Sequence, residues 1–493
     1  MDNFTIFDIM FDEYKIKSKI RLIEFFAGIG AQAKALKNLG ANFEHYKTCE
    51  WAVPSILAYS EIHHNELPKY GVKFSENLTK DEIIEYLHNK GISSNYNEPM
   101  QLSQIKRMSE DKLRQVYDCI QWNNNLVNIQ QVHGKDLEIV DKDKYEYILT
   151  YSFPCQDLSL AGKGKGMSRD GGTRSGMLWQ VERILGECNE LNCLPQVLLM
   201  ENVPQVIGEK NIKDFQSWRE KLESLGYSNY IEVLNAKHYG IPQNRERAFM
   251  ISILGEYNYT FPKKIPLEKK LKDMLEKNVD EKYYLSDKQI NKSLKETLET
   301  NEIDNVENSA YIDSYNKNVR KDNISCAITT RVDASNNSYL LIKEATKKGY
   351  KEAYEGDGVD ISGRIETHRG TVQKGISQTI KTSIDVGVVV KDDYVGTYEY
   401  SKSDNFMQGK DRLFRNKDIS GILLASGNHN GVCVNSNNLI IRKLTGKECY
   451  RLMGFSDEDC DNSRKVLSES MIYHTAGDSI VVNVLMAIFK QLL

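Results

Sequence analysis

Short apolar runs and helix-like polar patterns alternate along the first half of the chain. One apolar run spans residues 22–26 within "KIRLIEFFAGIGAQAKALKNLG", and glycines follow it at 28 and 30. Apolar residues then recur at helical spacing until Gly40. Because glycines let a ligand approach the backbone closely, this strand–turn–helix pattern predicts the opening of a nucleotide-binding α/β fold.

Three further apolar stretches predict more strands of the same sheet. "YEYILTYSF" (145–153) is rich in β-forming residues, and "PQVLLMENVP" (195–204) is almost continuously apolar, as in a buried parallel strand. "YIEVLNAKHYGIPQNRERAFMISIL" (230–254) contains two strands joined by a polar loop. The predicted fold class is therefore α/β.

The pattern changes twice along the chain. Residues 80–130 are polar with helical stretches, which predicts a helical insertion into the α/β domain. After a basic helical entry, residues 263–439 consist of short β-like pieces rich in Gly, Asn, Ser and Thr. We therefore expect a first domain over 1–262, a β-rich domain over 263–439, and a C-terminal segment, 440–493, that returns to the first domain.

Composition narrows the class of protein. The 493 residues carry a formal net charge of −4, so a polyanionic partner would need a local basic surface. The nine cysteines include no C-x-x-C pair, which favours a reducing cytosol over a disulfide or zinc framework. The N-terminus lacks the pattern of a signal peptide and no apolar run has membrane-spanning length, so a cytoplasmic protein without a membrane segment is expected.

Polar residues follow the predicted strands. Glu50 comes about twenty residues after the glycine turn, where a carboxylate can accept hydrogen bonds from ribose hydroxyls, and Trp51 can lie against an adenine ring. Asp136 precedes the strand at 145–153. Two alternatives remain for this half: a tight turn without a ligand, or an NAD-dependent dehydrogenase, which the spacing Gly28-x-Gly30-x-x-Ala33 also suits.

A cysteine, a glutamate and two arginines follow other strands. Cys155 comes directly after Pro154, Glu201 ends the strand at 195–204, and Arg245 and Arg247 lie in the loop before the last strand. A thiolate adds to electron-poor carbon, a glutamate can protonate a ring nitrogen, and an arginine can hold a ring carbonyl. This set suits activation of a pyrimidine: thiolate addition at C6 with protonation at N3 makes C5 of cytosine nucleophilic toward a methyl donor.

An ordered series of motifs resembles the DNA (cytosine-5) methyltransferase family. The series comprises "EFFAGIGAQ", "CEW", "TYSFPCQDLSLAGKGKG", "TRSGMLWQVERIL", "LLMENVP", "GIPQNRERAFM", "RKLTGKECYRLMGF" and "AGDSIVVNVLMAIF". It covers about 21–262 and 440–493, and its wording is most similar to the subgroup that includes CpG-specific bacterial enzymes. The resemblance implies a Rossmann-like, S-adenosylmethionine-dependent catalytic domain, with the β-rich interval as a smaller target-recognition domain.

The resemblance also implies residue roles. The catalytic positions are Cys155 as nucleophile, Pro154 holding its loop, Glu201 at the cytosine N3, Asn202 supporting that loop, Arg247 at the ring carbonyl and Arg245 near the nucleophile. The S-adenosylmethionine positions are Phe26, Gly28, Gly30, Glu50, Trp51, Asp136 at the adenine amino group, Leu178, Asp478 and Ser479. Asp478 departs from the usual Gly-Asn-Ser motif, which puts cofactor affinity in doubt if the side chain makes the contact.

Double-stranded DNA is the expected partner. A stacked cytosine must be swung out of the duplex before a thiolate can reach it, and the loop after Cys155 is glycine-rich and cationic. Its expected DNA contacts are Gln156, Ser159, Lys163, Lys165, Arg169 and Arg174. In the β-rich interval, Arg364, Arg369, Lys374 and Lys381 could contact phosphates, with His368 as a further donor, while Gln373, Gln378, Thr379 and Thr382 reach base edges. Solvated, non-contacting surfaces are the alternative in both places.

Three similar segments around Ile324, Ile376 and Ile419 form an internal echo. They predict either three similar strands of one β-rich domain or duplicated recognition elements.

The sequence thus favours a monomeric, sequence-specific DNA (cytosine-5) methyltransferase, with a role in restriction–modification or phage and host DNA protection. A cognate endonuclease is a possible partner, and no metal is expected. Two other classes remain open: a protein of this fold that binds nucleic acid without turnover or acts on RNA, and a dehydrogenase.

Overall fold

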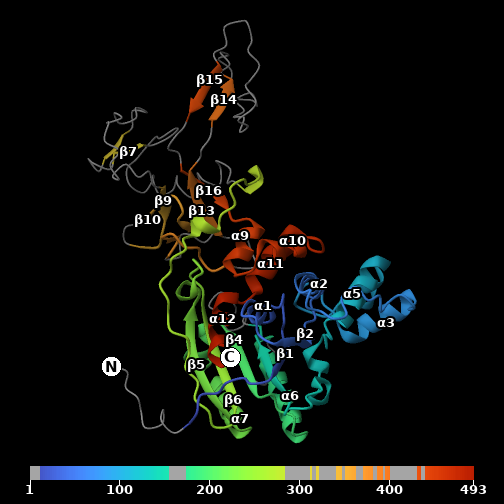
Figure 1. Ribbon diagram of the computed structural model, residues 1–493. Helices are drawn as coiled ribbons and strands as arrows, with labels where there is room; N and C mark the ends of the chain where they lie inside the picture. Colours follow the sequence, from blue (N-terminus) through green and yellow to red (C-terminus); the bar gives the residue numbers. More distant parts are fainter. Residues whose placement is uncertain are drawn as a thin grey trace. The chain divides into compact units, whose positions relative to one another are not determined.

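The computed structural model describes residues 11–154, 174–283 and 439–493, and between them the segments 311–313, 318–320, 340–346, 350–361, 370–380, 386–391, 395–399 and 430–434 (Figure 1). The chain divides into two compact units. Unit 1 comprises Met1–Lys269, Thr379–Ile384 and Gly446–Leu493, and unit 2 comprises Lys270–Gln378 and Asp385–Thr445. The predicted roles of Gln156, Ser159, Lys163, Lys165, Arg169, Arg364, His368, Arg369, Lys381 and Thr382 fall outside the described residues.

Unit 1 contains a six-stranded sheet in the order β2-β1-β3-β4-β6-β5. The strands are β1 (Lys19–Phe25), β2 (Phe43–Cys49), β3 (Tyr145–Tyr151), β4 (Val197–Asn202), β5 (Tyr227–Asn235) and β6 (Glu246–Leu254). The first four are parallel, whereas β6 is antiparallel to both β4 and β5. The predicted α/β class is confirmed, with one reversed strand that the pattern did not predict.

Helices cover both faces of this sheet. α6 (Leu178–Glu190) and α7 (Ile212–Ser224) share one apolar cluster with alternate residues of β1, β3 and β4, among them Phe25 and Met200. Successive strand side chains point to opposite faces, so Glu24 points the other way, toward α1 (Ala31–Asn38) and α2 (Val53–Ile62). The carboxyl ends of the parallel strands therefore lie between two helical layers, where α/β folds bind ligands.

The segment that follows α2 is helical, as its polar pattern predicts. It contains α3 (Lys80–Lys90), α4 (Leu102–Lys106) and α5 (Glu110–Trp122). A capping box between Thr79 and Glu82 starts α3, and Gly91 in left-handed geometry ends it. Their apolar faces pack with α2 into a separate core cluster.

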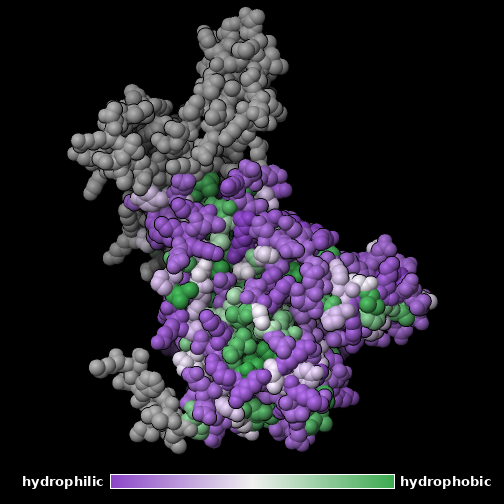
Figure 2. Space-filling view, viewed as in Figure 1, coloured by the Kyte–Doolittle hydropathy of each residue, from purple (hydrophilic) through white to green (hydrophobic). Residues whose placement is uncertain are grey.

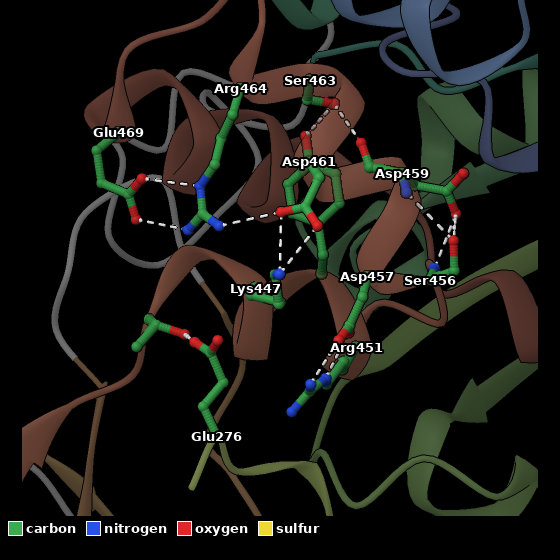
Figure 3. A network of polar contacts seen from close by, with 12 residues as sticks. Glu276, Lys447, Arg451, Ser456, Asp457, Asp459, Asp461, Ser463, Arg464 and Glu469 are labelled. Carbon is green, nitrogen blue, oxygen red and sulfur yellow. Dashed lines mark hydrogen bonds and ion pairs between the residues drawn. The ribbon is translucent and has the colours of Figure 1, made fainter. Parts of the chain in front are cut away.

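The C-terminal segment folds into unit 1 as four helices: α9 (Gly446–Leu452), α10 (Asp457–Arg464), α11 (Glu469–Asp478) and α12 (Val482–Leu492). A polar network joins α9, α10 and α11, with Asp461 between Lys447 and Arg464, and Arg464 also bound to Glu469 (Figure 3). The buried Lys34–Asp459 ion pair, 2.7 Å long, connects α10 to α1. The C-terminal helices are thereby attached to the helix that follows the glycine turn.

Unit 2 is built from short strands around a small apolar core. Its four-stranded sheet has the order β12-β11-β13-β16, comprising β11 (Gly358–Asp360), β12 (Val372–Gln373), β13 (Val386–Lys391) and β16 (Leu439–Lys443). Three antiparallel pairs accompany it: β9 (Leu340–Lys343) with β10 (Tyr350–Ala353), β14 (Val395–Glu399) with β15 (Asn430–Val434), and β7 (Tyr311–Asp313) with β8 (Asn318–Arg320).

The internal echo does not mark three strands. Ile376 lies in a bend just after β12, because a turn at Lys374 and Gly375 ends that strand. Ile324 and Ile419 lie outside the described residues.

The visible surface is mainly hydrophilic, with an apolar patch over the region of the unit 1 sheet (Figure 2). Within the described ranges, Glu469–Leu492 is the one stretch with the length and apolarity of a membrane span, and 67% of its most apolar window is buried. Ser479 interrupts this stretch between α11 and α12. The Glu469–Leu492 stretch is therefore mostly buried, as core helices of proteins are.

Candidate active site

The turn after β1 is open and conformationally strained. Phe26, Gly28 and Gly30 all have positive φ, of 55°, 54° and 78°. A Cβ on Gly28 would meet no atom within 4 Å, whereas one on Gly30 would lie 2.3 Å from His63 Nε2. Gly28 therefore leaves open space above the turn, and Gly30 allows the turn to lie directly on the residues below.

Glu50, at the end of β2, faces this turn. Its Oε2 accepts a hydrogen bond from the Gly28 amide at 3.0 Å, and its Oε1 accepts one from the Ala52 amide at 2.8 Å. Burial raises the pKa of Glu50 to about 7, and the nearby Asp478 charge adds to the rise. Since a carboxylate has about four acceptor positions, Glu50 keeps capacity for hydroxyl donors, as ribose recognition requires.

The end of β2 is held by residues that the sequence pattern did not predict. Asn125 Oδ1 accepts from the Glu50 amide at 3.0 Å, and its Nδ2 donates to the Glu50 carbonyl at 2.9 Å. Trp51 packs, partly buried, against the core of the α2–α5 helices. The run "NNNLVN" was a usable signal, because buried asparagines commonly satisfy backbone groups near a bend.

The C-terminal end of α11 lies near Glu50. The Asp478 carboxylate is 3.1 Å from His474 Nδ1, and the Tyr96 ring stacks on the His474 ring at 4.2 Å between centroids. Tyr96 also shares a 3.1 Å hydrogen bond with Ser55. The unusual aspartate is thus paired with a histidine one turn earlier, a contact that only the helix geometry reveals.

Glu201 and Arg247 meet at the same edge of the sheet. Glu201, 7% exposed, ends β4, and its Oε1 lies 3.2 Å from Arg247 Nε. Arg247 is inside β6, not in a loop as predicted. Because β6 is antiparallel to β4, its first residues lie beside the last residues of β4. The structure therefore brings together two of the predicted catalytic residues.

The chain that leads to Cys155 is held at this edge too. Asn202 Nδ2 donates to the Phe153 carbonyl at 2.9 Å, so β4 supports the segment that ends in Pro154. The catalytic role predicted for Asn202 stays a prediction. Cys155 itself lies outside the described residues.

Arg245 has a different environment from the one predicted. It is 4% exposed, and its guanidinium donates to the carbonyls of Ile380 (3.0 Å), Gly477 (3.1 Å) and Ser479 (2.8 Å). These bonds join the residue just before β6 to the end of α11 and to Ile380. The geometry makes Arg245 a structural clamp rather than a group that acts on the reacting base.

Asp136 does not reach the ligand edge. Its carboxylate accepts from the His133 amide and caps its own 3₁₀ helix, Gly134–Leu137. That helix packs on the far end of α6, where the Gly134 amide donates to Glu187 at 2.7 Å. Leu178 begins α6 nine residues earlier, so Asp136 lies more than two helical turns from the edge. The structure therefore does not bring Asp136 to the strand-end site, where the predicted adenine contact would lie.

Leu178 is fully buried in the same apolar cluster as Phe25. Arg174 begins the 3₁₀ helix Arg174–Met177 just before α6, and its side chain is not described. The predicted contact of Leu178 with a cofactor and that of Arg174 with DNA remain predictions.

Several predicted DNA contacts are engaged within the protein. Lys374 Nζ donates to the Glu352 carbonyl at 2.8 Å and lies 3.0 Å from Asp357 Oδ2. Gln378 Nε2 donates to the carbonyls of Gly358 and Thr371, and Gln373 Nε2 to that of Gly370 at 3.4 Å. The Thr379 hydroxyl donates to the Asn244 carbonyl at 2.8 Å. Lys374, Gln373 and Gln378 thus stabilise unit 2, and Thr379 is bound within unit 1. Composition alone could not separate these roles from DNA binding.

Comparisons with known proteins identify the family of the chain. The family model for the C-5 cytosine-specific DNA methylase matches residues 106–493. The orphan methyltransferase M.SssI of Spiroplasma monobiae is 43% identical over 272 residues, which are 54% of this chain and 68% of that protein. The type II methyltransferase M2.ScrFI of Lactococcus lactis is 38% identical over 55% of this chain and 71% of its own. The orphan methyltransferase M.SPRI of Bacillus phage SPR is 26% identical over 96% of this chain and 98% of its own.

Among solved structures, the Entamoeba histolytica methyltransferase EhMeth aligns over 97% of this chain and 98% of its own, with a TM-score of 0.47 and 14% identity.

The sheet with its strand-end site defines a Rossmann-like methyltransferase fold. The chain belongs to the C-5 cytosine-specific DNA methylase family, and it is a DNA (cytosine-5) methyltransferase.

Proposed function

We propose that this enzyme methylates C5 of a cytosine swung out of double-stranded DNA, through a covalent bond between Cys155 and C6. The observation that carries the proposal is the Glu201–Arg247 pair, 3.2 Å apart, at the sheet edge where Asn202 holds the chain leading to Pro154. A buried acid beside a guanidinium suits a ring that offers a nitrogen and a neighbouring carbonyl oxygen.

The proposed reaction begins at C6 of the cytosine. The Cys155 thiolate forms a bond to C6 while Glu201 transfers its proton to N3 and Arg247 hydrogen-bonds the ring carbonyl. C5 then carries the electron density needed to accept a methyl group. After transfer, a base removes the C5 proton, the thiolate leaves C6, and N3 returns its proton to Glu201. Pro154 and Asn202 keep the thiolate directed at the base.

S-adenosylmethionine supplies the methyl group when it is bound, and the residues present fit it. The Phe26–Gly30 turn leaves open space at Gly28, and Glu50 has acceptor capacity for two hydroxyls. Trp51, which is partly buried, provides apolar surface next to Glu50, and Leu178 is proposed to back the pocket from the start of α6. Ser479 and Asp478 complete the site from α11, whose end Arg245 clamps.

Unit 2 is the proposed target-recognition domain, and the cationic loop after Cys155 is proposed to contact the DNA backbone. We also propose that the enzyme is a monomer that acts on DNA in the cytoplasm of a bacterial or phage-infected cell. Its relatives include type II and phage orphan methyltransferases, so protection of DNA, with or without a cognate endonuclease, is the proposed role.

The test is covalent capture. Duplex DNA that contains 5-fluorocytosine cannot lose the atom at C5, so the enzyme should become permanently linked to it when the methyl donor is present. Bisulfite sequencing of plasmid DNA from expressing cells identifies the context to place in the duplex. Cys155→Ser should give no adduct and should still bind the methyl donor. An adduct with Cys155→Ser, or methylation of tRNA and not DNA, would refute the proposal.

A further inference from the structure

Three ligand atoms converge beneath the glycine turn, away from the substrate residues. They belong to His45 on β2, His63 directly after α2, and Glu66 in the next turn. One ligand atom of each lies within 4.8 Å of the other two. His45 is 9% and His63 1% exposed, and within the described part of the chain His45 Nε2, His63 Nδ1 and Glu66 Oε2 have no hydrogen-bond partner.

The opposite atoms of these groups are all engaged. His63 Nε2 lies 3.1 Å from the Ile29 carbonyl, and His45 Nδ1 lies 2.7 Å from the Tyr59 hydroxyl. Glu66 Oε1 is 2.5 Å from Lys37 Nζ. A hydrogen bond from one ring nitrogen to a carbonyl or hydroxyl commonly orients a metal-binding histidine.

These contacts decide which nitrogens carry protons. A carbonyl only accepts, so His63 Nε2 is the protonated nitrogen and Nδ1 has the lone pair. The Tyr59 hydroxyl donates to Glu24 at 2.6 Å, so His45 Nδ1 must donate to Tyr59, and His45 Nε2 has the lone pair. Each ring then has one nitrogen lone pair without a partner among the described residues, and Glu66 has one such carboxylate oxygen, and a cation would satisfy all three.

The electrostatics agree with neutral ligands. Burial lowers the pKa of His45 to about 4 and that of His63 well below its usual value. Neither ring is therefore charged at neutral pH, as metal coordination requires.

The fold places these residues on one side of the sheet. The pairing of β2 with β1 shifts at Tyr46, so that His45 aligns with Leu22 and faces α2, whereas Cys49 aligns with Phe25 and faces the opposite cluster. Such β-bulges redirect side chains near functional sites. The turn above lies directly on His63, since a Cβ at Gly30 would be 2.3 Å from its Nε2.

We propose that His45, His63 and Glu66 bind one divalent transition-metal ion of the zinc class, which fixes β2, α2 and the Ile29–Gly30 turn to one another. Two imidazole nitrogens and one carboxylate oxygen are ligands that zinc prefers. Tetrahedral ligands about 2 Å from zinc are roughly 3.4 Å apart, so ligand atoms that now lie up to 4.8 Å apart must move closer together. Lys37 holds the other oxygen of Glu66, Oε1, so its positive charge competes with the ion for that carboxylate.

The experiment measures metal binding by the tag-free full chain. After removal of metal with a chelator, the protein is titrated with zinc in competition with a chromophoric chelator, and with cobalt(II) to observe visible bands of four-coordinate cobalt. We expect about one equivalent bound. His63→Ala and Glu66→Gln should each weaken binding by at least roughly tenfold, the lower end for changes around a metal site.

Two further variants test whether the metal binds at this cluster and not elsewhere on the protein. His64→Ala removes the neighbouring histidine, whose Nδ1 contacts the Glu61 carbonyl outside the cluster, and should bind metal like the parent. Lys37→Met frees Glu66 and removes a positive charge, so it should bind zinc several-fold more tightly. If the His63→Ala variant fails to fold, the zinc affinities of Glu66→Gln and Lys37→Met still test whether the site exists. No stoichiometric binding by the parent, or equal affinity in Glu66→Gln, Lys37→Met and the parent, would overturn the site.

Discussion

At the residue scale, the proposed chemistry depends on a small number of side chains whose neighbours determine their roles. Glu201 is buried beside Arg247, and Glu50 accepts hydrogen bonds from the Gly28 and Ala52 amides. Arg245, two residues before Arg247, is bound to backbone carbonyls. Identical residue types therefore perform different tasks according to what lies within about 3 Å.

Glu201→Gln should lower the methyl-transfer rate by about 10²–10⁴-fold, because glutamine can hydrogen-bond N3 but cannot supply a proton. The loss should be smaller than that of Cys155→Ser. Single-turnover transfer of a labelled methyl group measures it, and donor affinity should change less than about twofold. Glu209→Gln, at an exposed position shortly after β4, is the control. A Glu201→Gln rate equal to the parent would remove Glu201 from the acid role.

Cofactor binding should weaken as the pH falls. Burial raises the pKa of Glu50 to about 7, so below pH 7 the carboxylate proposed to accept ribose hydroxyls becomes protonated. Affinity for S-adenosylmethionine should drop roughly tenfold per pH unit below that value and level off above it. Calorimetric titration between pH 5.5 and pH 8.5 measures this. Glu50→Gln should bind weakly at every pH, and an unchanged pH profile in this variant would contradict the assignment.

Glu50 should affect folding stability in the opposite sense. Its folded-state pKa is above the ordinary value, so its contribution is full below about pH 4.5 and is lost as the pH rises through about 7.

At the scale of elements, the site depends on how the C-terminal helices join the sheet. Arg245 connects β6 to the end of α11, and Lys34–Asp459 connects α1 to α10. Around these helices the network of Asp461, Arg464 and Glu469 is more exposed, and exposed ion pairs contribute little. The two buried contacts are therefore the ones whose loss should matter.

Arg245→Met should raise the KM for S-adenosylmethionine tenfold or more, because residues 477–479 lose their clamp. The rate at saturating donor should fall less than tenfold, and the free energy of unfolding by about 2–4 kcal/mol, since three buried charged hydrogen bonds disappear. Steady-state kinetics with urea denaturation measures these changes. A large fall in kcat at unchanged KM would restore the catalytic role that the sequence predicted.

Lys34→Met should lower the free energy of unfolding by about 3–5 kcal/mol, because it leaves a buried carboxylate without its cation. Asp459 also caps α10 through Ser456, so Asp459→Asn is the appropriate partner change. The double variant should recover a substantial part of the loss in chemical denaturation. A double variant whose loss equals the sum of the two single losses would mean that the pair is not coupled.

At the scale of the whole molecule, unit 1 is assembled from distant parts of the chain. Residues 446–493 belong to it, and α12 packs on α1. The Ile16 amide donates to the Leu492 carbonyl at 2.8 Å, so the first described residues meet the last helix. Unit 1 therefore needs residues 446–493 together with the N-terminal part of the chain, and most of unit 2 lies between these parts in the sequence.

A chain cut after residue 445 should lose S-adenosylmethionine binding, because the apolar face of α12, with Leu485, Ile488 and Phe489, would be missing from the core. Adding a peptide of residues 446–493 should restore binding in trans, as measured by calorimetry. A peptide with Phe489→Asp serves as the control and should not restore it. Full binding by the shortened chain alone would contradict this assembly.

Local periodicity and residue type were enough to predict the strand–turn–helix opening, the order of the motifs and Glu50, Glu201 and Arg247 as candidate site residues. Contacts between distant segments were needed to show that β6 reverses and brings Arg247 to Glu201, and that Arg245 clamps a segment 232 residues away. They also show that Asp136 and Lys374 bind groups in their own surroundings. The physical reason is that a side chain's task depends on the partner it meets. Burial and hydrogen bonding between distant segments select that partner, and no local pattern encodes it.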